Sequence, residues 1–249
     1  MTMPPISRAR GHSSTGGATD RASLLRTHPL FCELTPPILE RISAYIKRRS
    51  VPKGDRIFEK GDDGVGLIGV VSGSVKISVT SADGRDVVLN IIRSGEVFGE
   101  IALLDGRART ANATAMSDCE LIVIERREFI PFLRSEPDVT LKLMEILCSR
   151  LRRTSEQVQD VTFLNLSTRL AKTLLRLTAN AGSSGAVGKA TITQREISQI
   201  VGKSRESTNK RLRAWARRGW IRLERGSVTV LKADKLEELA AAGSDLDVS

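Results

Sequence analysis

The most specific part of the sequence is the stretch Val97-Phe-Gly-Glu-Ile-Ala-Leu-Leu-Asp-Gly-Arg-Ala-Arg-Thr-Ala111. Gly99 allows the backbone to approach an anion, and residues 100–103 can begin a short helix whose amide groups face a phosphate. Arg109 offers a charged fork to phosphate oxygens, and Glu100 can accept a hydrogen bond from a sugar hydroxyl. An acid and an arginine nine positions apart, beside a turn that a glycine initiates, suit a compact sugar phosphate.

Short apolar stretches alternate with turns on both sides of this segment, which is typical of strands. The pattern predicts strands at 56–58, 66–71, 74–79, 86–92, 112–115 and 120–124. Many short strands joined by Gly/Asp turns indicate an antiparallel β barrel or jelly roll. Helical spacing predicts short helices at 21–30, 36–47 and 125–133, and the Gly/Ser-rich residues 1–20 indicate a flexible tail.

A long helix is predicted at 138–162, with Pro137 at its first position or boundary. Residues at alternating spacings of three and four form a seam of Leu141, Met144, Cys148, Leu151, Ser155, Val158 and Thr162. A heptad-like seam suits pairing with a second copy of the chain. Because the seam contains Cys, Ser and Thr, it is equally compatible with packing onto the barrel.

The next part of the chain predicts a helix at 171–179 and a Gly/Ser/Ala-rich loop at 180–188. Thr193 and Glu196 have the spacing of a capping box, which starts a short helix. The apolar residues that this helix turns inward are Ile197, Ile200 and Val201.

A second helix follows at once. Gly202 makes a tight turn, Ser204 can cap a helix at 205–218, and Gly219 ends it. A hairpin with strands at 220–224 and 227–231 comes next. This order of helix, glycine turn, helix and hairpin is that of a winged helix-turn-helix that binds DNA.

The second helix has two faces. Thr208, Leu212 and Trp215 form an apolar stripe. The residues predicted to point outward are Arg205, Glu206, Asn209, Lys210, Arg213 and Arg217. Residues at the start of a recognition helix contact base edges, which suits Arg205, Glu206 and Lys210. The residues placed for phosphate contacts are Thr193, Lys203, Ser204 and Ser207.

The charge distribution agrees with binding to a polyanion. The net charge is +10, and residues 165–225 hold 14 Lys/Arg against 3 Asp/Glu, whereas residues 1–164 are nearly balanced. A basic block confined to one segment indicates a double-stranded DNA-binding module attached to a nearly neutral one.

Several classes of protein find no support in the sequence. Three widely spaced cysteines (Cys32, Cys119 and Cys148) and two histidines supply no metal, haem or disulfide framework, and buried reduced thiols are expected. No nucleophile–histidine pair or P-loop points to an enzyme. Without a signal peptide or a long apolar run, the expectation is a cytoplasmic protein that does not enter a membrane.

The stretch 97–111 resembles the phosphate-binding cassette of cyclic-nucleotide-binding domains almost end to end. The resemblance implies that Glu100 binds the ribose 2′-hydroxyl and Arg109 the cyclic phosphate. Gly99, Ile101, Ala102 and Thr110 would complete the contacts. The spacing from Glu to Arg is one residue shorter than in the family's archetype and equals that of kinase-type domains.

Residues 197–210 (Ile197-Ser-Gln-Ile-Val-Gly-Lys-Ser-Arg-Glu-Ser-Thr-Asn-Lys210) strongly resemble the DNA-binding region of the Crp/Fnr superfamily. The resemblance implies that Arg205, Glu206 and Lys210 read a GTGA-like half-site. Lys210 stands where the archetype has Arg, and lysine lacks the planar fork for a bidentate guanine contact. The long helix also resembles the family's dimer helix, in which a Thr–Ser pair contacts adenine with one hydroxyl from each subunit; here the pair is Thr154 and Ser155.

Together the patterns and the resemblance predict an α+β chain in five parts. These are a flexible tail (1–23), a double-stranded β-helix (jelly-roll) cyclic-nucleotide-binding domain (24–136), a dimerisation helix and hinge (137–163), a winged helix-turn-helix DNA-binding domain (164–236) and a C-terminal tail (237–249). The expected function is a homodimeric transcription regulator, not an enzyme, that cAMP controls and that binds a TGTGA-like palindrome. The resemblance also implies RNA polymerase as a partner.

Two alternatives stay open at this point. In the first, the protein binds DNA in the same way but responds to cGMP or another effector, or to no ligand, with Glu100 and Arg109 as a structural ion pair. A hydroxyl at Thr110 bears on this alternative because it can favour guanine in kinase-type domains. In the second, the chain is a nucleotide-binding regulatory subunit of an enzyme, against which the basic recognition helix argues.

Overall fold

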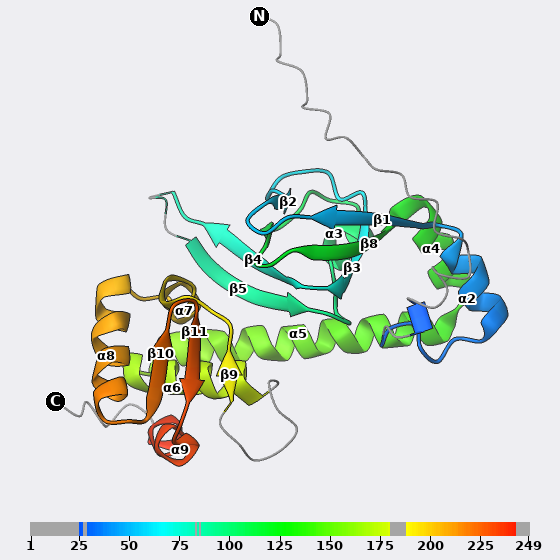
Figure 1. Ribbon diagram of the computed structural model, residues 1–249. Helices are drawn as coiled ribbons and strands as arrows, with labels where there is room; N and C mark the ends of the chain where they lie inside the picture. The colour runs from blue at the N-terminus through cyan, green and yellow to red at the C-terminus, as the bar shows by residue number, and fades with distance from the viewer. Residues whose placement is uncertain (1–24, 27–28, 83, 85, 180–187, 243–249) are drawn as a thin grey trace, which may run out of the picture.

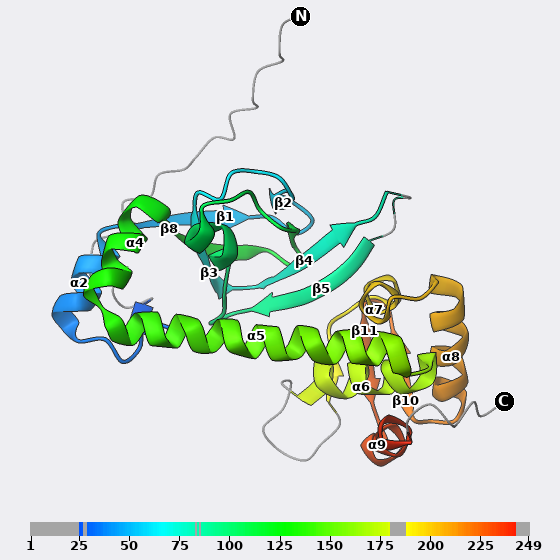
Figure 2. The ribbon, with the colours of Figure 1, turned by 180° about the vertical axis from the view of Figure 1, so that it is seen from behind.

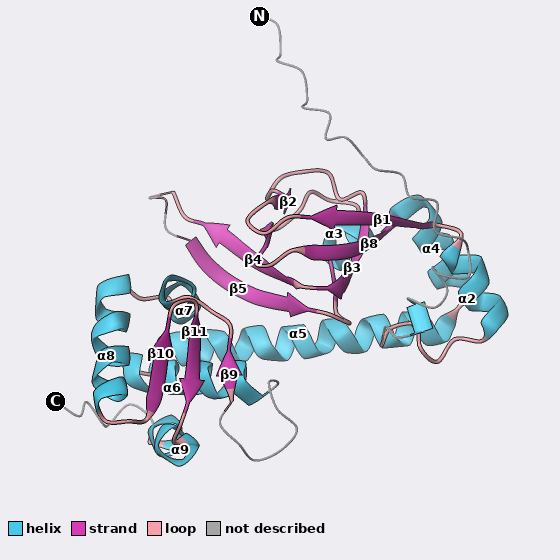
Figure 3. Ribbon diagram, viewed as in Figure 1, coloured by secondary structure: helices cyan, strands magenta, loops and turns pink. Residues whose placement is uncertain are grey.

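A computed structural model describes residues 25–26, 29–82, 84, 86–179 and 188–242. Figure 1 shows a β roll above one long helix, with a smaller helical domain at the far end of that helix. The expected tail 1–23 and the loop at 180–187 lie outside the described residues. Figure 3 separates the strand-rich roll from the mainly helical remainder of the chain.

The roll consists of two four-stranded sheets with the strand orders β1-β8-β3-β6 and β2-β7-β4-β5. Their strands are β1 (Ile46–Val51), β2 (Arg56–Phe58), β3 (Gly66–Ser72), β4 (Ser74–Thr80), β5 (Asp86–Arg93), β6 (Val97–Phe98), β7 (Asn112–Ala115) and β8 (Cys119–Glu125). All pairings are antiparallel. An apolar core between the sheets includes Val70, Val75 and Phe98. The predicted jelly-roll class is confirmed.

The strand β1 corrects a prediction. The expected helix at 36–47 ends early: α2 spans Pro36–Ser43, and Ile46 already pairs with Ile124 of β8. Four consecutive exposed residues between buried Ile46 and Val51 hide the alternation that marks a strand. Of the helix expected at 21–30, Leu25 and Arg26 are helical, Pro29 and Leu30 lie in a turn, and the rest lies outside the described residues.

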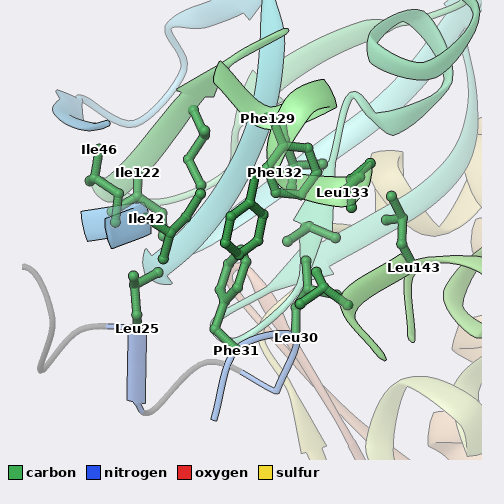
Figure 4. Packing of buried hydrophobic residues seen from close by; sticks show 14 of the residues in the cluster. Leu25, Leu30, Phe31, Ile42, Ile46, Ile122, Phe129, Phe132, Leu133 and Leu143 are labelled. Carbon is green, nitrogen blue, oxygen red and sulfur yellow. The ribbon is translucent and has the colours of Figure 1, made fainter. Parts of the chain in front are cut away.

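A second apolar cluster joins the outer face of the roll to the helices around it. Helix α4 (Arg126–Ser135) contributes Phe129 and Phe132, and Figure 4 shows these rings beside Phe31 and Leu30. Leu143 of the long helix belongs to the same cluster, so the start of that helix is anchored to the roll.

The long helix α5 spans Pro137–Phe163, and Figure 2 shows it running from the roll to the C-terminal domain. The stripe that faces the roll includes Val139 and Leu143, both buried. The predicted seam is a different stripe: Leu151 is 69% exposed and Val158 is 61% exposed. The seam therefore does not pack onto the roll, which was the alternative that the sequence left open.

The cysteines are all free thiols, as expected, but only Cys119 is buried. Cys32 and Cys148 are exposed, so the prediction of buried thiols is wrong for them. For Cys148 the reason is its place on the uncovered seam of α5.

The C-terminal domain contains α6 (Leu166–Ala179), β9 (Lys189–Ala190), α7 (Gln194–Val201), α8 (Arg205–Arg217), β10 (Ile221–Glu224), β11 (Ser227–Val230) and α9 (Ala233–Ala241). Its core surrounds Trp215 and Leu212. Helix α6 begins five residues before the expected start, where the Asn165 side chain accepts a hydrogen bond from the Thr168 amide (3.0 Å). The tail predicted from residue 237 is wrong for 237–241, because α9 continues through them and packs Leu236 into the core.

The two domains contact each other through β5 and α7. The Gln199 side-chain amide donates to the Asp86 carboxylate (3.3 Å), and Ile91 of β5 packs against the C-terminal core. Among the described helices, none has the length and apolarity needed to cross a bilayer.

Candidate functional site

The quoted cassette forms a strand, a turn and a short helix. After β6, Gly99 takes the left-handed conformation (φ 82°), and α3 runs from Glu100 to Asp105. A second left-handed glycine, Gly106, ends the helix. This geometry brings Glu100 and Arg109 into the interior, where they are 3% and 4% exposed. Charged residues are rarely so buried unless they are paired or functional.

The Arg109 guanidinium is bound by neutral groups. It donates to the carbonyls of Gly99 (2.8 Å) and Gly66 (2.9 Å) and lies over the Phe58 ring, 4.4 Å from its centroid. Burial lowers the pKa of Arg109, while the charges of Glu100 and Asp62 raise it. Since arginine stays protonated in proteins, the site holds a buried positive charge that forms no salt bridge with any described carboxylate.

Glu100 pairs with a residue that the sequence reasoning missed. Arg150 of α5 places a guanidinium nitrogen 2.5 Å from Glu100 Oε2 and also donates to the Val97 carbonyl. The Glu100–Arg150 contact lacks the alignment of a hydrogen bond, and Glu100 Oε2 has no hydrogen-bond donor in the described part of the chain. Arg150 lies one turn before Thr154 on the same face of α5, and this spacing could have predicted from the sequence that Arg150 lies near the ligand site.

These residues line a pocket of about 180 Å³ between the roll and α5. Seven of the eight predicted ligand residues lie in its wall: Gly99, Glu100, Ile101, Ala102, Arg109, Thr110 and Thr154. The wall also contains residues that were not predicted: Phe58, Ile77, Leu89, Asn90, Ile92, Phe98, Ala111, Arg150, Arg153 and Gln157. The pocket wall thus combines the charged side chain of Arg109 with the side-chain amides of Asn90 and Gln157.

The eighth predicted residue, Ser155, does not line the pocket of its own chain. It is exposed on the seam, and its hydroxyl donates to the Leu151 carbonyl one turn earlier (3.0 Å). Thr154 makes the same kind of bond to Arg150 (2.9 Å) but lies in the pocket wall. Neighbouring hydroxyls therefore face the pocket and the seam, respectively.

Substitution of Gly99 by alanine is expected to weaken nucleotide binding about tenfold or more, since one charge-assisted hydrogen bond is displaced. A Cβ atom at position 99 would lie 2.4 Å from Arg109 Nη1, so the guanidinium must move. Gly106→Ala is the matched control, because Gly106 also has positive φ but its Cβ would approach only Arg126, at 3.3 Å. Both variants should lose about 1–2 kcal/mol of folding stability from the left-handed alanine. Calorimetric titration with cAMP that finds equal affinities for the two variants would contradict this role of Gly99.

The helix-turn-helix has the predicted local geometry. Thr193 and Glu196 form both hydrogen bonds of a capping box at the start of α7. Gly202 is left-handed (φ 65°), and the Ser204 hydroxyl accepts from the Ser207 amide at the start of α8. The three residues of the apolar stripe, Thr208, Leu212 and Trp215, are buried.

Most of the predicted DNA-contacting residues are exposed: Thr193, Lys203, Ser204, Arg205, Glu206, Ser207 and Lys210. Asn209 differs from the prediction that it points outward. It is half-buried beside the apolar stripe, and its Oδ1 atom is buried without a hydrogen-bond partner among the described residues. The start of α8 shares a surface hollow with Ser81 and Asp86 of the roll.

Both the domain that contains the pocket and the helix-turn-helix domain match known protein families. Residues 48–136 match the cyclic nucleotide-binding domain, and residues 168–239 match the Crp-like helix-turn-helix domain. A CRP-like cAMP-activated global transcriptional regulator of Mycobacterium tuberculosis is 33% identical over 85% of this chain and 96% of its own length. The chain belongs to the Crp/Fnr family of transcription regulators.

Other members of the Crp/Fnr family are similar over most of their length. The cyclic AMP receptor protein of Thermus thermophilus is 34% identical over 87% of this chain and 98% of its own. The solved structure of the c-di-GMP-responsive global regulator CLP of Xanthomonas campestris has 27% identity and a TM-score of 0.69, covering 79% of this chain and 99% of that one. The family's domains are those of cyclic-nucleotide-responsive, DNA-binding transcription regulators and not of enzymes.

Proposed function

We propose that the chain is a homodimeric transcription regulator whose affinity for a TGTGA-like palindrome rises when cAMP binds in the pocket at Arg109. The observation that carries the proposal is the buried Arg109 guanidinium, which makes no salt bridge with a described carboxylate. A cyclic phosphate carries one negative charge and would neutralise it with charge-assisted hydrogen bonds. The regulators of M. tuberculosis and T. thermophilus, described as cAMP-activated and as a cyclic AMP receptor, support the choice of cAMP.

The remaining pocket residues suit the rest of such a ligand. Glu100 Oε2 has no hydrogen-bond donor among the described residues and can accept from a ribose hydroxyl, while the ion pair with Arg150 orients the carboxylate. Thr154 and the amides of Asn90 and Gln157 also line the pocket and offer donors and acceptors to a purine edge.

Coupling between pocket and DNA would pass through α5. Thr154 lies in the pocket wall and Ser155 on the seam, so a ligand that contacts both, one from each subunit, stabilises the paired helices. The linker between α5 and α6, near Phe163–Asn165, would then set the two α8 helices about 34 Å apart, one turn of DNA. In the described arrangement the start of α8 lies beside the roll, so the ligand would shift the population toward one that presents α8 to DNA.

A different cyclic nucleotide is the second candidate effector. Thr110 lies in the pocket wall, where a hydroxyl suits guanine, and Arg153 adds another guanidinium to that wall. The X. campestris relative is described as c-di-GMP-responsive. cGMP and c-di-GMP therefore belong in the same titrations as cAMP.

The proposed role has two further consequences. The protein would work in the cytoplasm of a bacterium, where the chromosomal DNA is. As a regulator of transcription it would also contact RNA polymerase while bound at its palindrome.

Titration of a fluorescent TGTGA…TCACA duplex at fixed salt tests the proposal. Wild-type affinity should rise with cAMP, and Arg205→Ala should lose discrimination against an altered half-site by about 1–3 kcal/mol. Lys203→Ala, an exposed neighbour expected at a phosphate, should weaken both duplexes alike and lower the salt dependence. Discrimination that survives in Arg205→Ala would show that α8 does not read the bases as proposed, and affinity that ignores every nucleotide would exclude a nucleotide trigger.

A further inference from the structure

The stripe of α5 that faces the roll becomes basic in its second half. After buried Leu143 come Arg150 and Arg153, both half-buried. Figures 1 and 2 show the end of β5 beside the middle of α5, and α6 running along the second half of α5. The charges of Arg93, at the end of β5, and of Arg176, on α6, both act on Arg153. The three arginines thus lie where the roll, the long helix and the C-terminal domain join.

These arginines lack partners that their burial would require. The Nε atoms of Arg153 and Arg176 are buried without a hydrogen-bond partner among the described residues. Neither guanidinium forms a salt bridge in the described part of the chain, whereas Arg150 has Glu100. Arg93 reaches across the junction and donates to the Leu177 carbonyl of α6 (3.4 Å).

The electrostatic environment of this cluster is unfavourable to its own charges. Burial lowers the pKa of Arg153, and the charge of Arg176 lowers it further, with Glu96 opposing and Arg93 adding to the effect. Burial also lowers the pKa of Arg176. Buried like charges destabilise a fold unless something compensates them.

The carboxylates near the cluster are largely engaged elsewhere. Asp160 pairs with Lys172 (2.8 Å), and Glu96 accepts from the Arg93 backbone amide (2.6 Å). Glu156 approaches Arg176 closely enough to raise its pKa but forms no salt bridge with it among the described contacts. The arginines therefore retain an excess of positive charge.

A surface hollow of about 630 Å³ opens beside the cluster. Its polar wall comprises Arg152, Arg153, Glu156 and Arg176, together with Glu145 and Ser149. The other wall is the apolar seam at Leu141, Met144 and Cys148, which a second copy would cover. A ligand held here would lie at the arginine end, between α5 and α6.

We propose that Arg153 and Arg176, assisted by Arg93, form a second anion site that holds a phosphate group at the domain junction. The guanidinium fork matches phosphate oxygens, and the anion would replace repulsion between α5 and α6 by shared hydrogen bonds. The site shares Arg153 with the nucleotide pocket but differs from it because Arg176, on the C-terminal domain, does not line that pocket. The phosphate could be free inorganic phosphate or pyrophosphate, or part of a small organic metabolite, because the same guanidinium contacts would serve each of them.

Calorimetric titration of the full chain with pyrophosphate, at fixed ionic strength in chloride, tests the site. Arg109→Gln is used as the background, since it removes the phosphate-binding residue of the nucleotide pocket. Pyrophosphate should bind this background, and the added substitution Arg176→Gln should weaken binding about tenfold or more. As the control, Arg134→Gln is added to the same background in place of Arg176→Gln. It removes a positive charge at an exposed position of α4 and should leave the affinity for pyrophosphate unchanged.

Thermal unfolding separates a binding role from a purely structural one. In the Arg109→Gln background without anion, the added substitution Arg176→Gln should not lower the melting temperature, because it removes a repelled charge. Pyrophosphate should raise the melting temperature of the background by more than that of the double variant. A parallel titration with glucose 6-phosphate distinguishes a free phosphate ligand from an organic phosphate ligand. If glucose 6-phosphate binds more tightly than pyrophosphate, the ligand is an organic phosphate; if it binds more weakly, the ligand is free phosphate or pyrophosphate. No saturable binding of either compound to the Arg109→Gln background, or equal binding with and without Arg176, would overturn the proposal.

Discussion

Replacement of Arg109 by glutamine is expected to lower the affinity for cAMP at least about a hundredfold, because two charge-assisted hydrogen bonds are lost. Arg109 is 4% exposed, and its charged side chain lines the pocket. Glutamine keeps a donor but no charge, so the phosphate would be buried without neutralisation. Calorimetry measures the affinity, and the DNA titration should show that cAMP no longer raises duplex binding.

Arg107→Gln is the matched control for this prediction. It removes the same charge two residues earlier in the cassette, where the side chain is exposed and lies outside the pocket wall. Its cAMP affinity should stay near that of wild type. Because Arg109 also holds the Gly66 and Gly99 carbonyls, melting curves must show that the Arg109→Gln variant is folded. A folded variant with wild-type affinity for cAMP would remove Arg109 from the binding site.

Leu151→Asp is expected to convert the proposed homodimer to a monomer and to lower DNA affinity at least about a hundredfold, since the second half-site no longer adds its binding. Leu151 is 69% exposed in the single chain, so aspartate there costs the monomer little. In a parallel pair of α5 helices the two carboxylates would face each other across the seam. Light scattering measures the mass, and the duplex titration measures the consequence for DNA.

Ser149→Asp serves as the control because it puts the same charge on an exposed position of α5 outside the seam. This variant should remain dimeric and bind DNA as wild type does. Substitution of Leu143 would not be informative, because that leucine is 2% exposed and packs against the roll, so its loss would unfold the chain. A Leu151→Asp protein that stays dimeric would mean that α5 pairs through another face.

The successful sequence predictions rest on signals that act over a few residues. The capping box of Thr193 and Glu196, the left-handed Gly99 and Gly202, and the spacing from Glu100 to Arg109 are local geometry. Their hydrogen bonds and dihedral angles depend little on the rest of the fold. For the same reason the bounds of α5 and of most strands were predicted to within about two residues.

Predictions failed where a partner distant in sequence controls the structure. β1 is an edge strand with four exposed residues in a row, and its pairing with β8 is what makes it a strand. The continuation of α9 past residue 236 is fixed by packing, because Leu239 and Ala240 lie against the C-terminal core. Asn209 is half-buried because it borders the stripe of Leu212 and Trp215.

The sequence was sufficient to predict the jelly-roll class, the cassette with Glu100 and Arg109, the helix-turn-helix and a heptad-like seam on α5, but it left open whether this seam packs onto the roll. Only the tertiary structure decided which stripe of α5 packs on the roll, and hence that Arg150 meets Glu100 while Leu151 stays open. It alone brings Arg93, Arg153 and Arg176 together from three elements. The difference arises because backbone dihedral angles and helix caps depend on residues that are neighbours in the chain. The contacts between buried charges depend instead on how separate helices and strands pack.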